Sequence, residues 1–199
     1  MPFGPLLVHI RHGETDWNVE SRLQGQQDIP LNPNGRGQAA RNGRALAAHL
    51  AAAGLDPDDL DWIASPLGRA RETMEIVRDA AGLPPAGYAL EPLLREVTFG
   101  TWEGFTIPEL KLRDPAGVAA RRADKWGFVP PGGESYQMLS ARIGGWLRRL
   151  EHPAVVVSHG GVQRVLEGLL LGRPPAEIPN LAVPQDRFLV FRDGEATWV

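Results

Sequence analysis

The chain has 199 residues, of which 43% are hydrophobic and 23% charged, a composition typical of a globular protein long enough to bury a sizeable core. A formal net charge of -3 excludes a global basic field for nucleic acid or an anionic membrane, so any attraction for phosphate must be local. The absence of cysteine excludes disulfides, thiolate metal sites and a cysteine nucleophile.

The sequence also predicts where the protein resides. No uninterrupted apolar run is long enough to span a bilayer, and residues 1–5 lack the positive charge of a secretory signal. We therefore expect a cytoplasmic protein with neither a membrane nor a nucleic acid as partner.

Apolar runs separated by turn residues predict strands that alternate with helices. Strands are expected over residues 6–10, 62–64, 88–94 and 154–158, and helices over residues 36–53, 68–81, 134–150 and 161–171. Asp193-Gly194, between residues 188–192 and 195–199, is typical of a β-hairpin. Residues 97–134, rich in Gly, Pro and aromatic side chains, form the least regular stretch. This alternation indicates an α/β fold.

Two of the expected strands are each followed by a histidine and a glycine. His12-Gly13 follows the first strand, and His159-Gly160 follows the strand that ends near residue 158. In an open α/β sheet, the carboxyl ends of the strands form the edge where ligands bind. Arg11 lies at the same edge, and Arg69 is expected there in the first turn of a helix. Two histidines and two arginines make a cationic pocket for a phosphoryl group, with His12 as candidate nucleophile.

Phosphoryl transfer needs a nucleophile, positive charge on the phosphate oxygens and an acid for the leaving oxygen. The carbonyl of Gly13 is expected to hold one ring nitrogen of a neutral His12. The expected donors to phosphate are Arg11, Arg69, a cationic His159, the Asn18 amide and backbone N–H groups after Gly160. The alternative, that His12 and His159 are satisfied core histidines, is disfavoured by the arginines beside them.

The segment Arg11-His12-Gly13-Glu14-Thr15-Asp16-Trp17-Asn18 resembles the signature of the histidine phosphatase superfamily, the phosphoglycerate-mutase-like proteins. Further blocks follow in the family's order over roughly residues 6–170: Arg22-Leu23-Gln24-Gly25, Asp28-Ile29-Pro30-Leu31, Gly35-Arg36-Gly37-Gln38-Ala39, Ser65-Pro66-Leu67-Gly68-Arg69-Ala70, Glu96, Phe99-Gly100-Thr101-Trp102-Glu103-Gly104 and Val157-Ser158-His159-Gly160-Gly161. The resemblance is closest to the short broad-specificity and α-ribazole phosphatase-type members.

The resemblance implies one domain over residues 1–199, a three-layer sandwich with a mainly parallel sheet, helices on both faces and residues 97–134 as a lid-like irregular insertion. It implies a phosphomonoester hydrolase that works through a phosphohistidine at His12, with Glu96 as general acid and base. It places Gln24 and Gly25 close to the substrate, a small phosphorylated metabolite, and implies no metal ion and no cofactor. Structural roles are expected for Glu14 and Glu103, and structural or solvated positions for His9, His49 and His152.

Two alternative functions remain. The first is a phosphoglycerate mutase, for which the pair Arg121-Arg122 would contact substrate from the lid. Mutases, however, carry Glu-Arg-His-Tyr-Gly where this chain has Glu96-Val97-Thr98-Phe99-Gly100, and a lysine near the position of Ile107. The second is a non-catalytic module that binds a phosphorylated ligand, which would not need Glu96. The sequence leaves a homodimer open.

Overall fold

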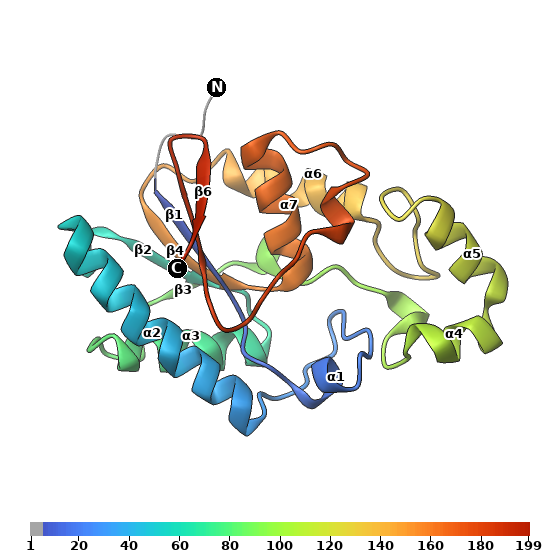
Figure 1. Ribbon diagram of the computed structural model, residues 1–199, viewed down its shortest axis with the longest axis horizontal. Helices are drawn as coiled ribbons and strands as arrows, with labels where there is room; N and C mark the ends of the chain where they lie inside the picture. The colour runs from blue at the N-terminus through green and yellow to red at the C-terminus, as the bar shows by residue number, and fades with distance from the viewer. Residues whose placement is uncertain (1–5) are drawn as a thin grey trace.

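The computed structural model describes residues 6–199, which form one six-stranded sheet between two layers of helices (Figure 1). The strands are β1 (Leu7–Arg11), β2 (Asp61–Ala64), β3 (Ala89–Leu90), β4 (Ala154–Ser158), β5 (Leu189–Arg192) and β6 (Glu195–Trp198), in the order β3-β2-β4-β1-β5-β6. Strands β1 to β4 are parallel, whereas β5 and β6 are antiparallel to their neighbours. The sheet is therefore mixed, with a parallel centre.

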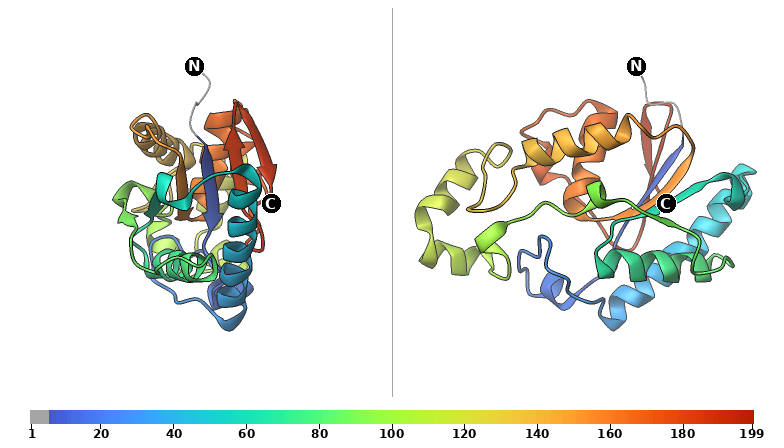
Figure 2. Two further views of the ribbon diagram at one scale, coloured as in Figure 1. Left: turned by 90° about the vertical axis from the view of Figure 1, so that its left-hand side faces the viewer. Right: turned by 180° about the vertical axis from the view of Figure 1, so that it is seen from behind.

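Both faces of the sheet are covered by pairs of helices (Figure 2). Helices α2 (Pro33–Ala53) and α3 (Gly68–Ala80) pack on one face, where Val8 and Val155 point. Helices α6 (Tyr136–Leu147) and α7 (Gly160–Leu171) cover the other face, where Leu7 and Val156 point. Coverage on both sides explains why these strands are apolar along their whole length. The layered α/β fold expected from the sequence is confirmed.

The starts of two helices differ from the predicted positions because polar side chains cap them. Helix α2 begins at Pro33, not at residue 36, because the Asn32 side chain accepts a hydrogen bond from the Gly35 backbone N–H. It ends where expected, at Gly54, which has the left-handed φ of 65°. Helix α6 begins at Tyr136, since Ser135 caps the N–H of Met138.

Two predictions of local structure were wrong. Residues 88–94 contain only the two-residue β3, because Pro92 cannot donate to a strand ladder and begins the 3-10 helix η2 (Pro92–Leu94). Residues 97–134 are not irregular throughout, since they contain α4 (Ile107–Arg113) and α5 (Pro115–Ala123). Thr106 and Asp114 cap these helices, each followed by a proline in the first turn. Both helices lie away from the sheet, as Figure 1 shows.

The remaining elements are short. They are α1 (Asp16–Val19), η1 (Pro57–Asp59), η3 (Gly100–Trp102) and η4 (Ile178–Asn180). The β5–β6 hairpin was predicted correctly, with left-handed φ values of 52° at Asp193 and 81° at Gly194. No helix within residues 6–199 is both long and apolar enough to cross a membrane.

Candidate active site

The pairing of β1 with β4 brings His12 and His159 together at one edge of the sheet. Arg11 and Ser158 are paired at the ends of the two strands, and the backbone N–H of His12 donates to the Ser158 carbonyl at 2.9 Å. His12 directly follows Arg11, and His159 directly follows Ser158. The centroids of the two imidazole rings lie 5.2 Å apart. The register of β1 and β4 therefore fixes the relative position of the two imidazoles. Both rings are buried, so the site is shielded from water.

The His12 ring is held in one orientation by its immediate neighbour. Its Nδ1 lies 2.7 Å from the Gly13 carbonyl oxygen, so Nδ1 carries the hydrogen and Nε2 keeps its lone pair. Burial, with the cations of Arg69 and Arg11 nearby, lowers the pKa of His12 well below its ordinary value. A Cβ atom at Gly13 would lie 2.3 Å from the Gly35 carbonyl oxygen, so only glycine fits there. The site therefore presents a neutral imidazole whose Nε2 carries no hydrogen.

Arg69 approaches His12 from the first turn of α3. Its Nε lies 3.3 Å from His12 Nε2, while its terminal nitrogens donate to the carbonyls of Gln27 at 2.6 Å and Gly25 at 2.8 Å. The side chain is only 1% exposed and forms no ion pair with a carboxylate of residues 6–199. A buried guanidinium held by neutral carbonyls keeps its positive charge available to an anionic ligand.

Arg11 is a second cation without a carboxylate partner within the described chain. It donates to the Val183 carbonyl at 2.5 Å, and its buried Nε has no hydrogen-bond partner. Burial lowers the pKa of Arg11 to about 10, so the side chain remains charged at neutral pH. An unpaired buried N–H on a cation is costly unless a ligand accepts from it.

His159 is held by a residue that the sequence reasoning did not assign a role. Its Nε2 lies 2.7 Å from Ser65 Oγ, and its buried Nδ1 has no partner. The sequence predicts a cationic His159 on bound phosphate, which its surroundings do not favour. Burial and the charge of Arg69 lower the pKa of His159 well below the usual value. The sequence signals for Ser65 are its place in the block Ser65-Pro66-Leu67-Gly68-Arg69-Ala70 and its position directly after β2, beside the end of β4.

Glu96 lies half-buried beside the start of α7. Its Oε2 accepts from the Gly161 backbone N–H at 3.0 Å, and its Oε1 accepts from the Val97 N–H at 2.9 Å. The Gly161 N–H, expected as a donor to phosphate, is thus already used by Glu96. Burial lowers the pKa values of Arg11 and Arg69, and the charge of Glu96 partly opposes that lowering, so this carboxylate lies near both guanidinium groups.

Asn18 is oriented by Gln185, a residue for which the sequence gives no signal. The Gln185 amide nitrogen donates to Asn18 Oδ1 at 3.1 Å and to the His12 carbonyl at 3.0 Å. Asn18 Oδ1 also accepts from the Thr15 backbone N–H at 3.1 Å. With its oxygen satisfied in this way, Asn18 has its Nδ2 hydrogens left for a ligand.

The other residues singled out from the sequence fall into two groups. Gln24, Gly25 and Gly160 are buried, and Gln24 Oε1 has no hydrogen-bond partner. Arg121 on α5 is half-buried, whereas its neighbour Arg122 is exposed.

Two carboxylates near the site have structural partners. Glu103 Oε1 accepts from the Gln26 N–H, the Thr98 hydroxyl and the Phe99 N–H. Glu14 accepts from two asparagine side chains, those of Asn32 and Asn34. Both carboxylates therefore fasten loops around the site.

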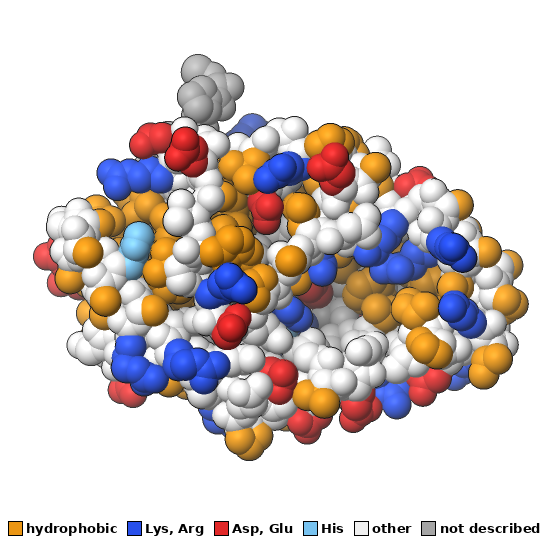
Figure 3. Space-filling view, in the orientation of Figure 1, with side chains coloured by type: hydrophobic (Ala, Val, Ile, Leu, Met, Phe, Trp, Pro, Cys, Tyr) orange, Lys and Arg blue, Asp and Glu red, His pale blue; other side chains and the backbone are white. Residues whose placement is uncertain are grey.

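Figure 3 shows Lys and Arg side chains gathered at a hollow between the main body and the α4–α5 part of the molecule.

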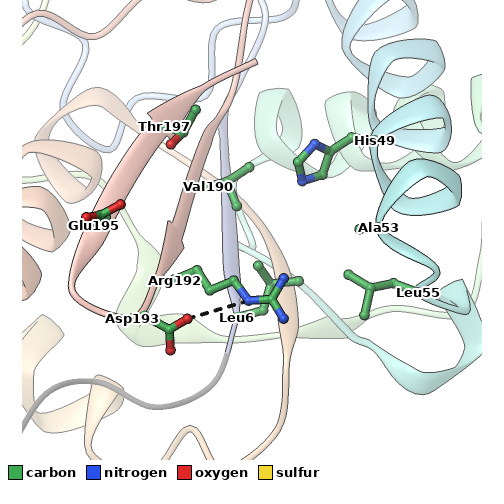
Figure 4. Close-up of a pocket in the computed structure, with 9 residues that line it drawn as sticks. All are labelled: Leu6, His49, Ala53, Leu55, Val190, Arg192, Asp193, Glu195 and Thr197. Atoms are coloured by element: carbon green, nitrogen blue, oxygen red, sulfur yellow. Dashed lines mark ion pairs between the residues drawn. The ribbon is translucent and has the colours of Figure 1, made fainter.

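Within residues 6–199, no group of three or more His, Asp or Glu side chains is placed to hold a metal ion. A different cavity, of about 300 Å³, lies between the end of α2 and the β5–β6 hairpin (Figure 4). One of its lining residues is Leu6, which lies at the end of β1 opposite to His12. None of the candidate site residues lines this cavity.

Comparison with known protein families matches residues 7–198 to the family described as "Histidine phosphatase superfamily (branch 1)". A glucosyl-3-phosphoglycerate phosphatase of Mycolicibacterium vanbaalenii is 31% identical over 97% of this chain and 82% of that protein. An adenosylcobalamin/α-ribazole phosphatase of Salmonella typhimurium is 32% identical over 88% of this chain and 84% of that protein. A 2,3-bisphosphoglycerate-dependent phosphoglycerate mutase of Beijerinckia indica is 30% identical over 94% and 91%, respectively.

Solved structures similar to this chain include phosphatases with the same names as these sequence relatives. The α-ribazole phosphatase of Shigella flexneri superposes with a TM-score of 0.79 and 30% identity, covering 96% of this chain and 93% of that one. The mycobacterial glucosyl-3-phosphoglycerate phosphatase superposes with a TM-score of 0.77 and 30% identity, covering 94% and 89%.

Proposed function

This chain belongs to the histidine phosphatase superfamily, and from that premise we propose that it hydrolyses a phosphomonoester of a small metabolite without a metal ion, through a phosphohistidine at His12. The observation that carries the proposal is the His12 ring. Its Nδ1–H donates to the Gly13 carbonyl at 2.7 Å, and its lowered pKa leaves Nε2 unprotonated at neutral pH. A neutral ring nitrogen with a fixed lone pair is a nucleophile.

The substrate phosphate binds among the two guanidinium groups and the nearby donors that lack partners. Arg11 and Arg69 donate to its oxygens, and a phosphate oxygen is a stronger acceptor for Arg69 Nε than the His12 nitrogen at 3.3 Å. The buried Nδ1 of His159 and the Nδ2 hydrogens of Asn18 supply further donors. These groups concentrate positive charge on the oxygens that gain negative charge in the transition state.

In the first chemical step, His12 Nε2 forms a bond to phosphorus while the bond to the leaving oxygen breaks. Glu96, in its protonated form, gives its proton to that oxygen, so an alcohol leaves. The Gly13 carbonyl stabilises the positive charge that develops on the ring, since it accepts from Nδ1–H at 2.7 Å. The product of this step is phospho-His12.

In the second step, water attacks phosphorus and the bond to His12 Nε2 breaks. The Glu96 carboxylate takes a proton from that water, which restores its starting form and leaves inorganic phosphate. Glu96 is positioned for both transfers because backbone N–H groups hold its two oxygens beside Arg11 and Arg69. Residues 97–134, which include α4 and α5, would cover the substrate as a lid, with Gln24 and Gly25 beneath it.

The names of the relatives suggest substrates in which a large alcohol carries the phosphate, either a glucosyl-phosphoglycerate or an α-ribazole phosphate. A phosphoglycerate mutase is the second candidate, since the Beijerinckia indica relative carries that name. It is less well supported, because Val97, Phe99 and Ile107 replace the polar and basic residues that mutases carry there. A module that only binds phosphorylated ligands would not need the carboxylate of Glu96, which the Gly161 N–H holds in place.

The deciding experiment is hydrolysis of 4-nitrophenyl phosphate in the presence of a chelator by the wild-type protein and by His12→Ala. Wild-type turnover that is abolished in the variant is the expected result. His152→Ala, at an exposed histidine, is the matched control and retains full activity. Undiminished turnover by His12→Ala would refute the phosphohistidine route. Interconversion of 3- and 2-phosphoglycerate faster than hydrolysis would establish the mutase instead.

A cytoplasmic location and a homodimer stay predictions. Cell fractionation tests the first, and light scattering of the purified protein tests the second.

A further inference from the structure

The peptide group between Gly13 and Glu14 links the candidate nucleophile to helix α2. Its carbonyl oxygen, on Gly13, accepts from His12 Nδ1 at 2.7 Å, and its N–H, on Glu14, donates to Gln38 Oε1 at 2.8 Å. A backbone N–H can only donate, so the Gln38 amide must present its oxygen to it. Gln38, this peptide group and the His12 ring therefore form one chain of hydrogen bonds.

Close packing holds the same peptide group against the start of α2. A Cβ atom at Gly35, in the first turn of α2, would lie 2.1 Å from the Glu14 carbonyl oxygen and 2.5 Å from the Glu14 nitrogen. The backbone N–H of Asn32 donates to the Glu14 carbonyl at 2.9 Å. Gln38 comes in the next turn of the helix, and its side chain is only 8% exposed. Packing of backbone against backbone thus brings a buried amide to the Glu14 N–H.

This chain of hydrogen bonds acts on the charge that develops in the first chemical step. As His12 Nε2 gives its lone pair to phosphorus, the ring becomes positively charged, and its Nδ1–H donates more strongly to the Gly13 carbonyl. An acceptor on the N–H side of a peptide group polarises the carbonyl, because hydrogen bonds in a chain strengthen one another. Gln38 therefore makes the Gly13 carbonyl a better acceptor when the charge on the ring appears.

We propose that Gln38 is a positioning residue for the nucleophile, which acts on His12 through the Glu14 N–H and the Gly13 carbonyl. This proposal rests on the proposed function, in which Nε2 bonds to phosphorus while the leaving oxygen departs with the bonding pair and takes a proton from Glu96. In the second step water bonds to phosphorus, its proton goes to Glu96 and the bonding pair returns to Nε2, so the ring loses its positive charge. Gln38 therefore speeds the formation of phospho-His12 and does not speed its hydrolysis.

Two substitutions at residue 38 test the acceptor itself. Gln38→Met keeps the length of the side chain without its oxygen, whereas Gln38→Glu keeps an acceptor oxygen whether or not the carboxyl group is ionised. For 4-nitrophenyl phosphate, we expect kcat/KM, which reports the formation of phospho-His12, to fall by about 10-fold in Gln38→Met, as the loss of one buried hydrogen bond produces. Gln38→Glu should restore most of it. Rapid-quench measurements with the radiolabelled ester should show slower formation of phospho-His12 in Gln38→Met, with hydrolysis no slower than in the wild type.

The His12 Nδ1 proton gives a readout in the protein without substrate. Its nuclear magnetic resonance signal should shift upfield in Gln38→Met, because its acceptor is weaker, and should remain at least as far downfield in Gln38→Glu. Leu50→Val, which shortens a buried side chain near the opposite end of α2, is the control and keeps both kcat/KM and the signal. If Gln38→Met does not fold, Gln38→Asn gives the same comparison, because its amide is one methylene too short to reach the Glu14 N–H.

Equal losses of kcat/KM in Gln38→Met and Gln38→Glu would overturn the proposal, as would an unchanged His12 signal in Gln38→Met or equal slowing of both chemical steps. The wild-type protein distinguishes this outcome from failure of the proposed function. If it forms no phospho-His12, the phosphohistidine route is refuted. A His12 signal that shifts in Gln38→Met and not in Gln38→Glu would still support the positioning of His12 by Gln38.

Discussion

Glu96 Oε2 accepts a hydrogen bond from the Gly161 backbone N–H at 3.0 Å, which fastens the candidate acid to the first turn of α7. The contact requires glycine, since a Cβ atom at residue 161 would lie 2.3 Å from Glu96 Oε1. His159, two residues earlier, belongs to the same strand-to-helix connection. One connection therefore positions both His159, the proposed hydrogen-bond donor to phosphate, and Glu96, the proposed acid and base.

The variant Glu96→Gln keeps the shape of the side chain but removes the acidic proton. We expect kcat/KM, which reports the steps up to departure of the alcohol, to fall by about 10²- to 10⁴-fold for alkyl phosphates, the usual contribution of general acid catalysis. Aryl phosphates should lose much less, because a phenolate leaves without help from an acid. Steady-state kinetics on 4-nitrophenyl phosphate and an alkyl phosphate check this ratio. Equal losses on both esters would show that Glu96 does not protonate the leaving oxygen.

The variant Ser65→Ala tests how His159 is positioned. It removes the hydroxyl 2.7 Å from His159 Nε2 and leaves a buried ring nitrogen without a partner. We expect kcat to fall by about 10-fold or more, the cost of an unsatisfied buried group. Nitrogen chemical shifts of His159 should report a changed tautomer, which a simple loss of stability would not produce. Unchanged kcat and shifts would exclude this positioning role.

His9 predicts how the stability of the fold depends on pH. It lies buried in β1 with Nε2 2.6 Å from Ser158 Oγ, and burial lowers its pKa from 6.5 to about 3. Between these values the unfolded chain binds a proton that the native protein does not. Stability is therefore fully present above about pH 6.5 and falls as the pH decreases toward 3, by up to about 1.4 kcal/mol per pH unit.

Urea denaturation at a series of pH values measures this slope. In His9→Gln, the change in the free energy of unfolding per pH unit below about pH 6.5 should decrease by the contribution of one proton. His12 and His159 also have lowered pKa values, so part of the slope remains in the variant. An identical slope in the wild type and His9→Gln would mean that His9 is protonated in the native protein.

The sequence predicted the central part of the site because strand ends and glycines can be recognised locally. Arg11 and His12 follow one apolar strand, His159 follows another, and a parallel sheet places such ends at one edge. The layered fold followed from the same alternation of strands and helices. Pairing in register then determines the 5.2 Å between the two imidazole rings, a distance that periodicity alone does not give.

Other features depend on contacts between distant segments and left no local signal. Helices α4 and α5 have only seven and nine residues, too short for an amphipathic repeat to stand out among prolines and glycines. Gln185 contacts Asn18 and His12 across more than 160 positions of sequence. The block that contains Gln38 can be recognised in the sequence, but the contact of Gln38 with the Glu14 N–H depends on how α2 packs beside the end of β1.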